Sequence, residues 1–308
     1  MEEKIVLQNI TKTYGKTEVL HDINLELEKG KIYGLIGRNG AGKTTMLSII
    51  SAQNPATSGK VTCNGMPVWE NPKALEHICF SREINPMGTT GQGNGYKVKD
   101  YLRAASWYMP NWDKEMADHL VKEFNLDVNK KVMKLSKGML SMLTIVLALA
   151  SKADYTFLDE PVAGLDVVMR EYFYRILLEE FAETGRTFVI STHIIEEAAD
   201  IFEEVIMIDK GQIIKKENTQ DLLDTAVHVS GKAEDVDAAC AGMQVIHEEK
   251  MGRSKGVTVL LKEGELALKG LNRVNFEDKL IKNIKFRFRD LGKFTFTRSQ
   301  SALAIEAE

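Results

Sequence analysis

The chain is 308 residues long, and its 44% hydrophobic and 27% charged residues make a globular composition with room for one large domain or two ordinary ones. Its formal net charge of -4 gives no general attraction to nucleic acid, so nucleic-acid binding would require a local basic patch. Cys63, Cys79 and Cys240 lack the spacing of a disulfide framework or a metal site, so we expect inert thiols in a reducing compartment.

The start of the chain and its most apolar segment predict neither a secretory signal nor a membrane span. The opening MEEKIVLQNI is acidic and lacks the basic and apolar regions of a secretory signal. The most apolar segment, residues 139–150, is shorter than the roughly 20 residues that cross a bilayer. We therefore expect a cytoplasmic chain, with any membrane crossing supplied by another polypeptide.

The N-terminal part predicts a strand, a glycine loop and a helix in succession. Residues 23–27 alternate apolar and polar, which predicts a half-buried strand, and Gly30 then turns the chain into KIYGLIG, an apolar run typical of a central strand. TTMLSIISAQ has helical spacing, and KVTC predicts a further strand that ends in a turn at Asn64 and Gly65.

A loop and two helices follow. Residues 81–96 contain four glycines, which is typical of a mobile loop. Residues 98–109 and 114–125 predict two helices separated by a proline, with Asp113 as the N-cap of the second. We take residues 97–135, approximately, as a helical subdomain.

The rest of the chain alternates strands and helices and then changes character. DYTFLDE, RTFVIST and EEVIMID are short apolar strands separated by helical patterns, an order that builds a mostly parallel sheet with helices on both faces. Beyond Lys216, strands such as GVTVLLK, FRFRD and KFTFTRS, with turns at Gly256 and Gly292, indicate a small α+β domain. We predict an α/β core over residues 1–218 and an accessory domain over residues 219–308.

The sequence GRNGAGKTT satisfies the phosphate-loop pattern G-x-x-x-x-G-K-[ST] between a predicted strand and a predicted helix. In a P-loop NTPase core, backbone N–H groups surround the β-phosphate, Lys43 reaches the β- and γ-phosphates, and Thr44 offers its hydroxyl to Mg²⁺. A glycine turn that merely joined strand to helix would not need this lysine. The predicted nucleotide-binding residues are Gly37, Asn39, Gly40, Ala41, Gly42, Lys43, Thr44 and Thr45, the last on the α-phosphate.

Two acidic residues end the buried strand of YTFLDEP, at the sheet edge where ligands collect in open α/β folds. Asp159 suits an indirect partner of Mg²⁺. Glu160 suits the carboxylate that positions and polarises the attacking water, because phosphoryl transfer depends mostly on positioning and electrostatics. The alternative is a solvated pair of charges at a strand end.

Two single residues are weaker candidates. His193 follows RTFVIST at the same sheet edge, where an imidazole can hold the γ-phosphate and the water. The alternative is a histidine with a purely structural role. Tyr14, in TKTYGKTEVL, is predicted to stack on an adenine ring, and a core aromatic is the alternative.

The motifs GRNGAGKTT, LSKGM, YTFLDEP, AGLD and STH, in this order and at these separations, resemble those of an ATP-binding-cassette (ABC) ATPase over about residues 2–216. LSKGM corresponds to the family signature usually written LSGGQ, from which Lys137 and Met139 depart. The resemblance implies that Ser136, Gly138 and the following helix N-terminus act on the γ-phosphate bound by a second copy. An ordinary N-cap serine is the alternative interpretation of Ser136.

The resemblance implies two further roles. Glu83 occupies the place where the family keeps a glutamine that touches Mg²⁺ and reports the nucleotide state to the membrane subunit; a glutamate can still ligate Mg²⁺ but adds a charge. Asp166 in AGLD matches the loop that contacts the second copy, with Ala163 in place of a serine. The implied metal-binding residues are Thr44, Glu83 and Asp159.

Three functions compete. YMPNWD and LSKGM resemble bacterial exporter-type ATPases with a C-terminal extension, which implies a homodimeric, Mg²⁺-dependent ATPase that drives a separate integral-membrane permease from the inner face of the membrane. We expect residues 81–96 to contact that permease, and we expect no direct nucleic-acid contact.

A soluble ABC ATPase acting on ribosomes or nucleic acid is the alternative, although such proteins usually carry two cassettes or a long coiled coil. A kinase or GTPase would need a second substrate pocket or an N-K-x-D segment.

Overall fold

The computed structural model describes residues 3–85, 95–192, 201–219, 221, 226–241, 244–251, 254–260, 294–298 and 303–307. Contacts divide the chain into two compact units, Met1–Lys216 and Glu217–Glu308. Each unit is described by itself.

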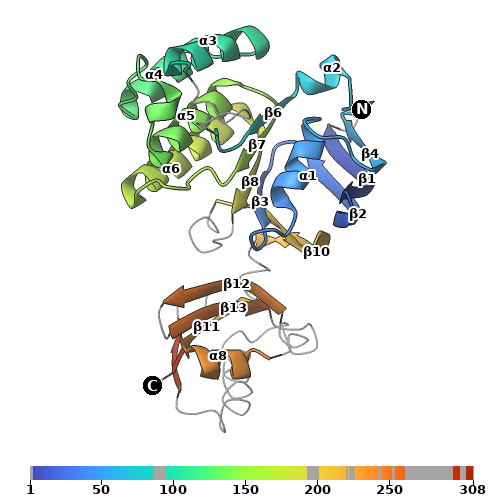
Figure 1. The fold of residues 1–308 in the computed structure, drawn as a ribbon, viewed down its shortest axis with the longest axis vertical. Coiled ribbons are helices and arrows are strands. Elements are labelled where there is room, and N and C mark those ends of the chain that lie inside the picture. The colour runs from blue at the N-terminus through green and yellow to red at the C-terminus, as the bar shows by residue number, and fades with distance from the viewer. Residues whose placement is uncertain are drawn as a thin grey trace. The chain divides into compact units, whose positions relative to one another are not determined.

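The first unit combines strands and helices in mixed order (Figure 1). Its strands are β1 (Lys4–Tyr14), β2 (Thr17–Glu28), β3 (Ile32–Ile36), β4 (Ser58–Cys63), β5 (Met66–Pro67), β6 (Ile78–Ser81), β7 (Tyr155–Asp159), β8 (Thr187–Thr192), β9 (Glu204–Asp209) and β10 (Gln212–Asn218). Its helices are α1 (Lys43–Ile50), α2 (Pro72–Leu75), α3 (Val98–Tyr108), α4 (Lys114–Glu123), the short 3-10 helix η1 (Val132–Lys134), α5 (Lys137–Ala150) and α6 (Val167–Thr184).

A mostly parallel sheet forms the centre of this unit, with strand order β10-β9-β3-β8-β7-β6. The pairs β3–β8, β3–β9, β6–β7 and β7–β8 are parallel, and all five residues of β3 are buried. Such burial follows when helices or a second sheet cover both faces. The predicted α/β fold is confirmed, and the carboxyl ends of β3, β7 and β8 meet at one edge of the sheet.

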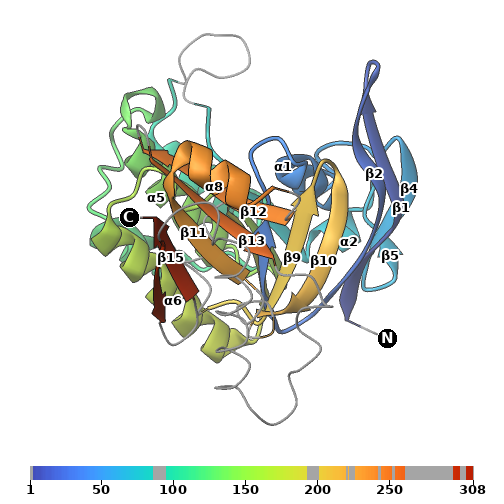
Figure 2. The same ribbon diagram turned by 90° about the horizontal axis from the view of Figure 1, so that it is seen from below.

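The strands β2, β1, β4 and β5 form a second, antiparallel sheet in that order, which the sequence did not predict. The strand predicted at residues 23–27 belongs to it, and Ile23, Leu25 and Leu27 are buried in alternation with exposed neighbours. Helix α1 lies between the two sheets (Figures 1 and 2). Its apolar side chains, including Leu47, share one core with residues of β1, β2, β3 and β7.

The two predicted helices of the helical subdomain are present as α3 and α4. The Asp113 side chain accepts the N–H of Met116 at 2.9 Å, which confirms the predicted N-cap of α4. A small core that includes Val98, Val132 and Leu143 joins α3 and η1 to α5, which also packs on β6 and β7. Helix α5 therefore connects the subdomain to the sheet.

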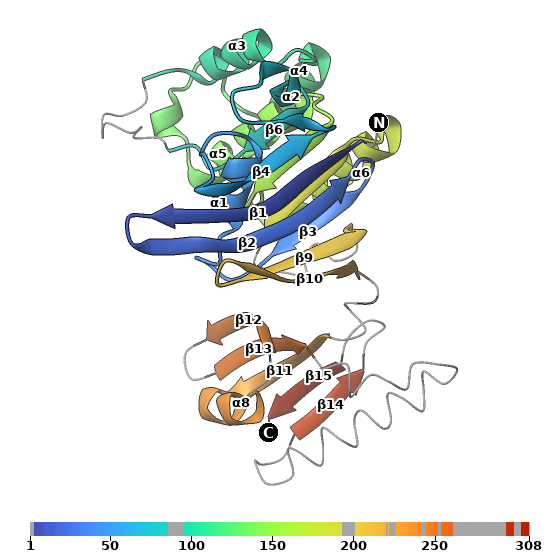
Figure 3. The ribbon, with the colours of Figure 1, turned by 90° about the vertical axis from the view of Figure 1, so that its right-hand side faces the viewer.

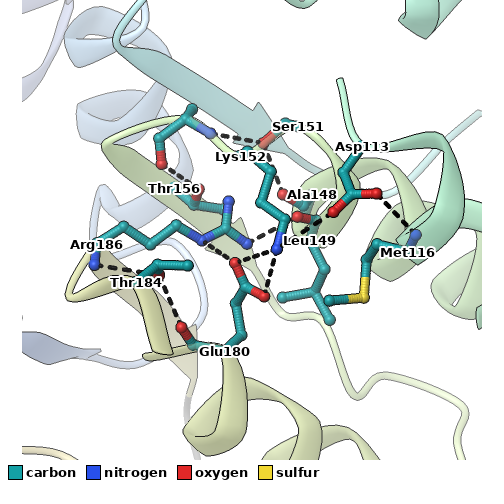
Figure 4. Close-up of polar contacts among 11 residues, drawn as sticks. Asp113, Met116, Ala148, Leu149, Ser151, Lys152, Thr156, Glu180, Thr184 and Arg186 are labelled. Carbon is teal, nitrogen blue, oxygen red and sulfur yellow. Dashed lines mark hydrogen bonds and ion pairs between the residues drawn. The ribbon is translucent and has the colours of Figure 1, made fainter. Parts of the chain in front are cut away.

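A buried ion-pair network joins the beginning of α4 to the ends of α5 and α6 (Figure 4). Glu180 is 1% exposed and accepts Lys152 Nζ at 2.7 Å, while Arg186 Nε lies 3.1 Å from the same carboxylate. Lys152 also lies 3.5 Å from Asp113, and Arg186 Nη2 donates to the carbonyl of Leu149 at 2.8 Å. Burial lowers the pKa of Arg186, and the Glu180 charge opposes that effect.

The second unit is a small α+β domain. Its elements are β11 (Ala226–Lys232), α8 (Ala233–Ala239), β12 (Gln244–Met251), β13 (Ser254–Leu260), β14 (Phe294–Arg298) and β15 (Leu303–Ala307). The sheet order is β12-β13-β11-β15-β14 (Figure 3), and α8 packs on β11 and β13. Strand β11 runs antiparallel to β13 and parallel to β15.

The turn predicted at Gly256 is wrong. Gly256 lies inside β13 and pairs with Ser230 and Glu249 on the two neighbouring strands, so the connection from β12 falls earlier, between Met251 and Ser254. The strand continues through the glycine because the buried side chains on either side of it hold β13 in place. The predicted turn at Gly292 and the FRFRD strand lie outside the described residues.

The described part of the chain contains no helix that combines the length and the hydrophobicity needed to span a bilayer. Helix α5, which holds the most apolar segment of the sequence, is 14 residues long and is buried along most of its length.

Candidate active site

The phosphate-loop motif lies between β3 and α1, as predicted, and its glycines are required by close packing and by backbone conformation. A Cβ at Gly37 would lie 2.3 Å from the carbonyl oxygen of Ile208, and one at Gly42 would lie 2.7 Å from Leu20 Cδ2. Gly40 and Gly42 have φ angles of 82° and 110°, which side-chain-bearing residues rarely adopt. The loop therefore curls tightly against β9 and leads directly into the first turn of α1.

Lys43 lies buried within this loop. Its Nζ donates to the carbonyl of Gly37 at 2.6 Å and lies 3.5 Å from Glu160 Oε1 on the neighbouring strand end. Only 6% of its side chain is exposed. The ammonium group thus sits where the loop, the helix N-terminus and the acidic strand end converge, a place suited to phosphate oxygens.

Thr44 and Asp159 meet at the same edge. Thr44 Oγ1 donates to Asp159 Oδ2 at 2.6 Å, although 115 positions separate the two residues in the chain. Hydroxyl and carboxylate oxygens are the donors that Mg²⁺ prefers. Among the described residues no group of three or more His, Cys, Asp or Glu is arranged to hold a metal. The pair fits a cation that takes its other ligands from phosphate and water.

Glu160 adopts a left-handed backbone conformation, with φ of 48°. Such a conformation costs a residue other than glycine about 1–2 kcal/mol, and strain of this kind clusters at functional sites. Its N–H points at Ser191, lying 3.2 Å from the carbonyl oxygen and 3.1 Å from Oγ. The turn places the Glu160 carboxylate beside Lys43, and its water-positioning role stays a prediction.

The signature motif begins helix α5. Ser136 is its N-cap, and its Oγ accepts the N–H of Met139 at 3.3 Å, so the capping interpretation holds in the single chain. Both Ser136 and Lys137 are exposed, which leaves this helix N-terminus open on the surface of the described chain. The contact of Ser136 and Gly138 with a phosphate on a second copy stays a prediction.

The AGLD turn packs against the signature motif. A Cβ at Gly138 would lie 2.6 Å from the carbonyl oxygen of Gly164, and Ser141 Oγ donates to the carbonyl of Ala163 at 2.6 Å. Asp166 is the N-cap of α6 and accepts the N–H of Met169 at 2.9 Å. Its contact with a second copy also stays a prediction.

Three predicted site residues remain: Tyr14, Glu83 and His193. The first two lie within the described residues. Tyr14 ends β1 with 48% of its surface exposed, packs its ring 4.8 Å from Lys12 Nζ and is not a core residue. Glu83 is exposed just beyond β6, whose end pairs with the end of β7 that carries Asp159. His193 and the glycine-rich residues 86–94 lie outside the described residues.

Ser191 is the site residue that sequence reasoning missed. It lies on β8 directly opposite Asp159 on β7, and its Oγ donates to Asp159 Oδ1. A serine near the end of an apolar strand carries little signal by itself. Its importance depends on the register of β7 and β8, which becomes evident only in the folded sheet.

Comparison with known proteins gives two family matches. Residues 20–163 match the family described as ABC transporter, and residues 258–308 match the family described as ThiI ferredoxin-like domain. The ABC transporter ATP-binding protein YtrB of Bacillus subtilis (strain 168) is 32% identical over 193 residues, which cover 63% of this chain and 64% of that protein. The bacitracin transport ATP-binding protein BcrA of Enterococcus faecalis is 30% identical over 224 residues, which cover 72% of this chain and 71% of that protein.

A solved structure shares the fold of the first unit. It is an ATP-binding cassette in a dimeric, post-hydrolysis state bound to ADP and Pi, with a TM-score of 0.60 and 22% sequence identity. The match covers 70% of this chain and 98% of that one. At this level of identity the likeness establishes a common arrangement of strands and helices.

Proposed function

This chain belongs to the family of ABC transporter ATP-binding proteins, and we propose that two copies of it close on ATP to drive a separate integral-membrane permease. It is an ATPase, the ATP-binding and ATP-hydrolysing subunit of its transporter. The observation that carries the proposal is the convergence of Lys43 and Thr44 with Asp159 and Glu160 at one sheet edge. We take residues 1–218 as the ATPase domain, with a helical subdomain near residues 97–135, and residues 219–308 as an accessory domain.

The proposed chemistry divides among the loop backbone and six side chains. Backbone N–H groups of the loop and the Lys43 ammonium bind the β- and γ-phosphates. Thr44 and Asp159 would hold Mg²⁺, which would neutralise charge on those phosphates. Glu160, fixed by its strained backbone near Lys43, orients a water molecule toward the γ-phosphate and accepts its proton. Glu83 and His193 are proposed to complete the cation and γ-phosphate contacts.

A second copy supplies the rest of the site. The chain has one phosphate loop and one signature motif, and the exposed N-terminus of α5 is suited to an anion presented from outside the chain. Ser136 and Gly138 of one copy then contact the γ-phosphate held by the other, and Asp166 contacts the partner across the dimer. The dimeric state of the solved cassette with ADP and Pi supports this arrangement.

The transport role rests on the family and on its members. The similarity to BcrA, a bacitracin transport ATP-binding protein, supports a role in transport, and we propose that the direction is export. In such a transporter the subunit lies on the cytoplasmic face of the membrane, attached through its permease, and residues 81–96 are proposed to contact that permease. Isolation of the chain from its native membrane should recover a polypeptide with several membrane spans.

Dimer closure is tested with Glu160→Gln, which removes the proton acceptor but keeps the size of the side chain. This variant should bind MgATP, hydrolyse it slowly and sediment as a dimer with ATP, because the closed state is no longer broken by hydrolysis. Lys43→Ala is the control and should lose nucleotide binding. A Glu160→Gln protein with near-normal turnover, or one that stays monomeric at micromolar concentration with ATP, contradicts the proposal.

A further inference from the structure

Ser191 is a fully buried serine near the carboxyl end of β8, with 0% of its surface exposed. In the parallel register of the sheet it lies between Leu35 on β3 and Asp159 on β7. Because directly paired residues on adjacent strands present their side chains to the same face, the Ser191 hydroxyl and the Asp159 carboxylate lie side by side. The contact thus follows from the way the three strands pair.

The Ser191 hydroxyl makes two contacts at once. Its Oγ donates to Asp159 Oδ1 and accepts the backbone N–H of Glu160 at 3.1 Å. The same N–H lies 3.2 Å from the Ser191 carbonyl oxygen. A single buried side chain therefore holds both acidic residues of the site, one through its carboxylate and the other through its backbone.

The contact with Asp159 orients that carboxylate. Its Oδ2 accepts Thr44 Oγ1 at 2.6 Å, while Oδ1 is occupied by Ser191. The final torsion of an aspartate side chain has a broad, shallow energy profile, so a carboxylate held at one oxygen only is free to rotate. With both oxygens fixed, Oδ2 stays directed at the residue that offers its hydroxyl to the cation.

The contact with Glu160 supports a strained backbone. With φ of 48°, Glu160 depends on its surroundings to stay in the left-handed region. Its N–H has two acceptors on Ser191, the carbonyl oxygen and the hydroxyl, and loss of the hydroxyl leaves one. The Glu160 side chain, which lies beside Lys43, would then be less firmly directed toward the γ-phosphate position.

We propose that Ser191 is a positioning residue for ATP hydrolysis: its hydroxyl directs Asp159 toward Thr44 and holds Glu160 in the conformation that presents its carboxylate. This inference rests on the function proposed above. Residues that orient metal ligands in this way typically change metal affinity or activity about 10–100-fold when they are replaced.

The test compares Ser191→Ala and Ser191→Thr with the unchanged chain and with Ser151→Ala. Ser151 is also a buried serine, 2% exposed, and its hydroxyl donates to the carbonyl of Ala148 at the end of α5, so its variant controls for loss of a buried hydroxyl elsewhere. Four quantities are measured on each protein: ATP affinity in EDTA, Mn²⁺ affinity of the ATP complex by electron paramagnetic resonance, and kcat and KM for ATP hydrolysis.

Ser191→Ala should keep ATP affinity in EDTA within about twofold, because the phosphate loop is intact, and should lose about tenfold or more in Mn²⁺ affinity and in kcat. Ser191→Thr keeps a hydroxyl and should recover most of both losses, while Ser151→Ala should change neither. Unchanged Mn²⁺ affinity and kcat in Ser191→Ala overturn the inference. So does an equal loss of metal-free ATP binding, which would make Ser191 a purely structural residue. If the unchanged chain itself fails to hydrolyse ATP, the proposed function fails, whereas the comparison of Mn²⁺ affinities still decides the role of Ser191.

Discussion

At the scale of single residues, Glu160 combines a chemical role with backbone strain. Its φ of 48° lies in a region that favours glycine, and the residue sits at the end of β7 beside Lys43. A carboxylate is therefore kept at this position although the backbone conformation disfavours any side chain. Stability and activity oppose each other at this one residue.

The strain is measurable by comparing Glu160→Gly with Glu160→Ala, since both lack the carboxylate and only alanine keeps a Cβ. We expect the glycine variant to be more stable by about 0.5–1 kcal/mol, because relief of about 1–2 kcal/mol of left-handed strain is partly offset by the greater freedom of glycine in the unfolded chain. Urea denaturation of the two proteins checks this. Equal stability would mean that the backbone at this position is not strained.

The three cysteines should be inert in the native protein, as their spacing in the sequence suggests. All three are free and buried, and burial raises the pKa of Cys63 to about 12 and also raises the pKa of Cys79 and Cys240. Since the thiolate is the reactive form, labelling by iodoacetamide at pH 8 should be slow in the folded chain and complete in denaturant. Rapid labelling of any native cysteine contradicts this expectation.

At the scale of helices and strands, the network around Glu180 fixes the helical subdomain to the sheet (Figure 4). Removal of this one carboxylate would leave Lys152 and Arg186 close together without their shared anion. Arg186 is buried, so its charge cannot recover full hydration when its partner is removed, as the charge of a surface residue can. The ion pairs that join the ends of α5 and α6 therefore depend on the Glu180 carboxylate.

Glu180→Gln should destabilise the protein by about 3–5 kcal/mol, the usual cost of removing one partner from a buried ion pair. Asp118→Asn is the matched control, because Asp118 pairs with Lys114 on the exposed face of α4 and its loss should cost no more than about 0.5 kcal/mol. Chemical denaturation of both variants gives the comparison. Similar small losses would show that the buried network contributes little.

Elements with regular patterns were predictable and irregular ones were not. The buried run of β3 and the alternation in β2 led directly to the correct strands. Strand β1 was missed because Asn9, with φ of 51°, and a register shift between Leu7 and Ile10 interrupt its alternation. The phosphate loop and the acidic strand end were found from local motifs, whereas Ser191 requires knowledge of which strands are neighbours.

At the scale of the whole molecule, carboxylates near the ends of the strands give the stability a pH dependence. Burial tends to raise the pKa of Glu204, but hydrogen bonds from Lys31 and Lys216 outweigh it, so the pKa is lowered overall. The pKa of Asp154 is lowered in the same way, with His77 and Lys29 opposing the effect of burial. Groups with a lowered pKa stabilise the folded chain above their unfolded pKa values, near 4, and lose that contribution as the pH falls through the folded pKa.

Glu204→Gln should therefore be less stable than the unchanged chain at pH 7, and the difference should shrink as the pH falls below about 4, where the native carboxylate becomes protonated. Urea denaturation at a series of pH values between 7 and 3 measures the difference directly. A difference that stays constant over this range would exclude an electrostatic origin.

The close approach of Gly138 and Gly164 makes two separate sequence motifs interdependent. A side chain at Gly138 would collide with the Gly164 carbonyl oxygen, and one at Gly164 would lie 3.0 Å from Lys137 Cγ. The signature motif and the AGLD turn are therefore sterically coupled, so a substitution in one constrains the residues allowed in the other. If a different signature motif is introduced into this chain, the AGLD turn from the same source should be introduced with it. Replacement of one motif alone would create a cavity or a steric clash where the two backbones are in contact.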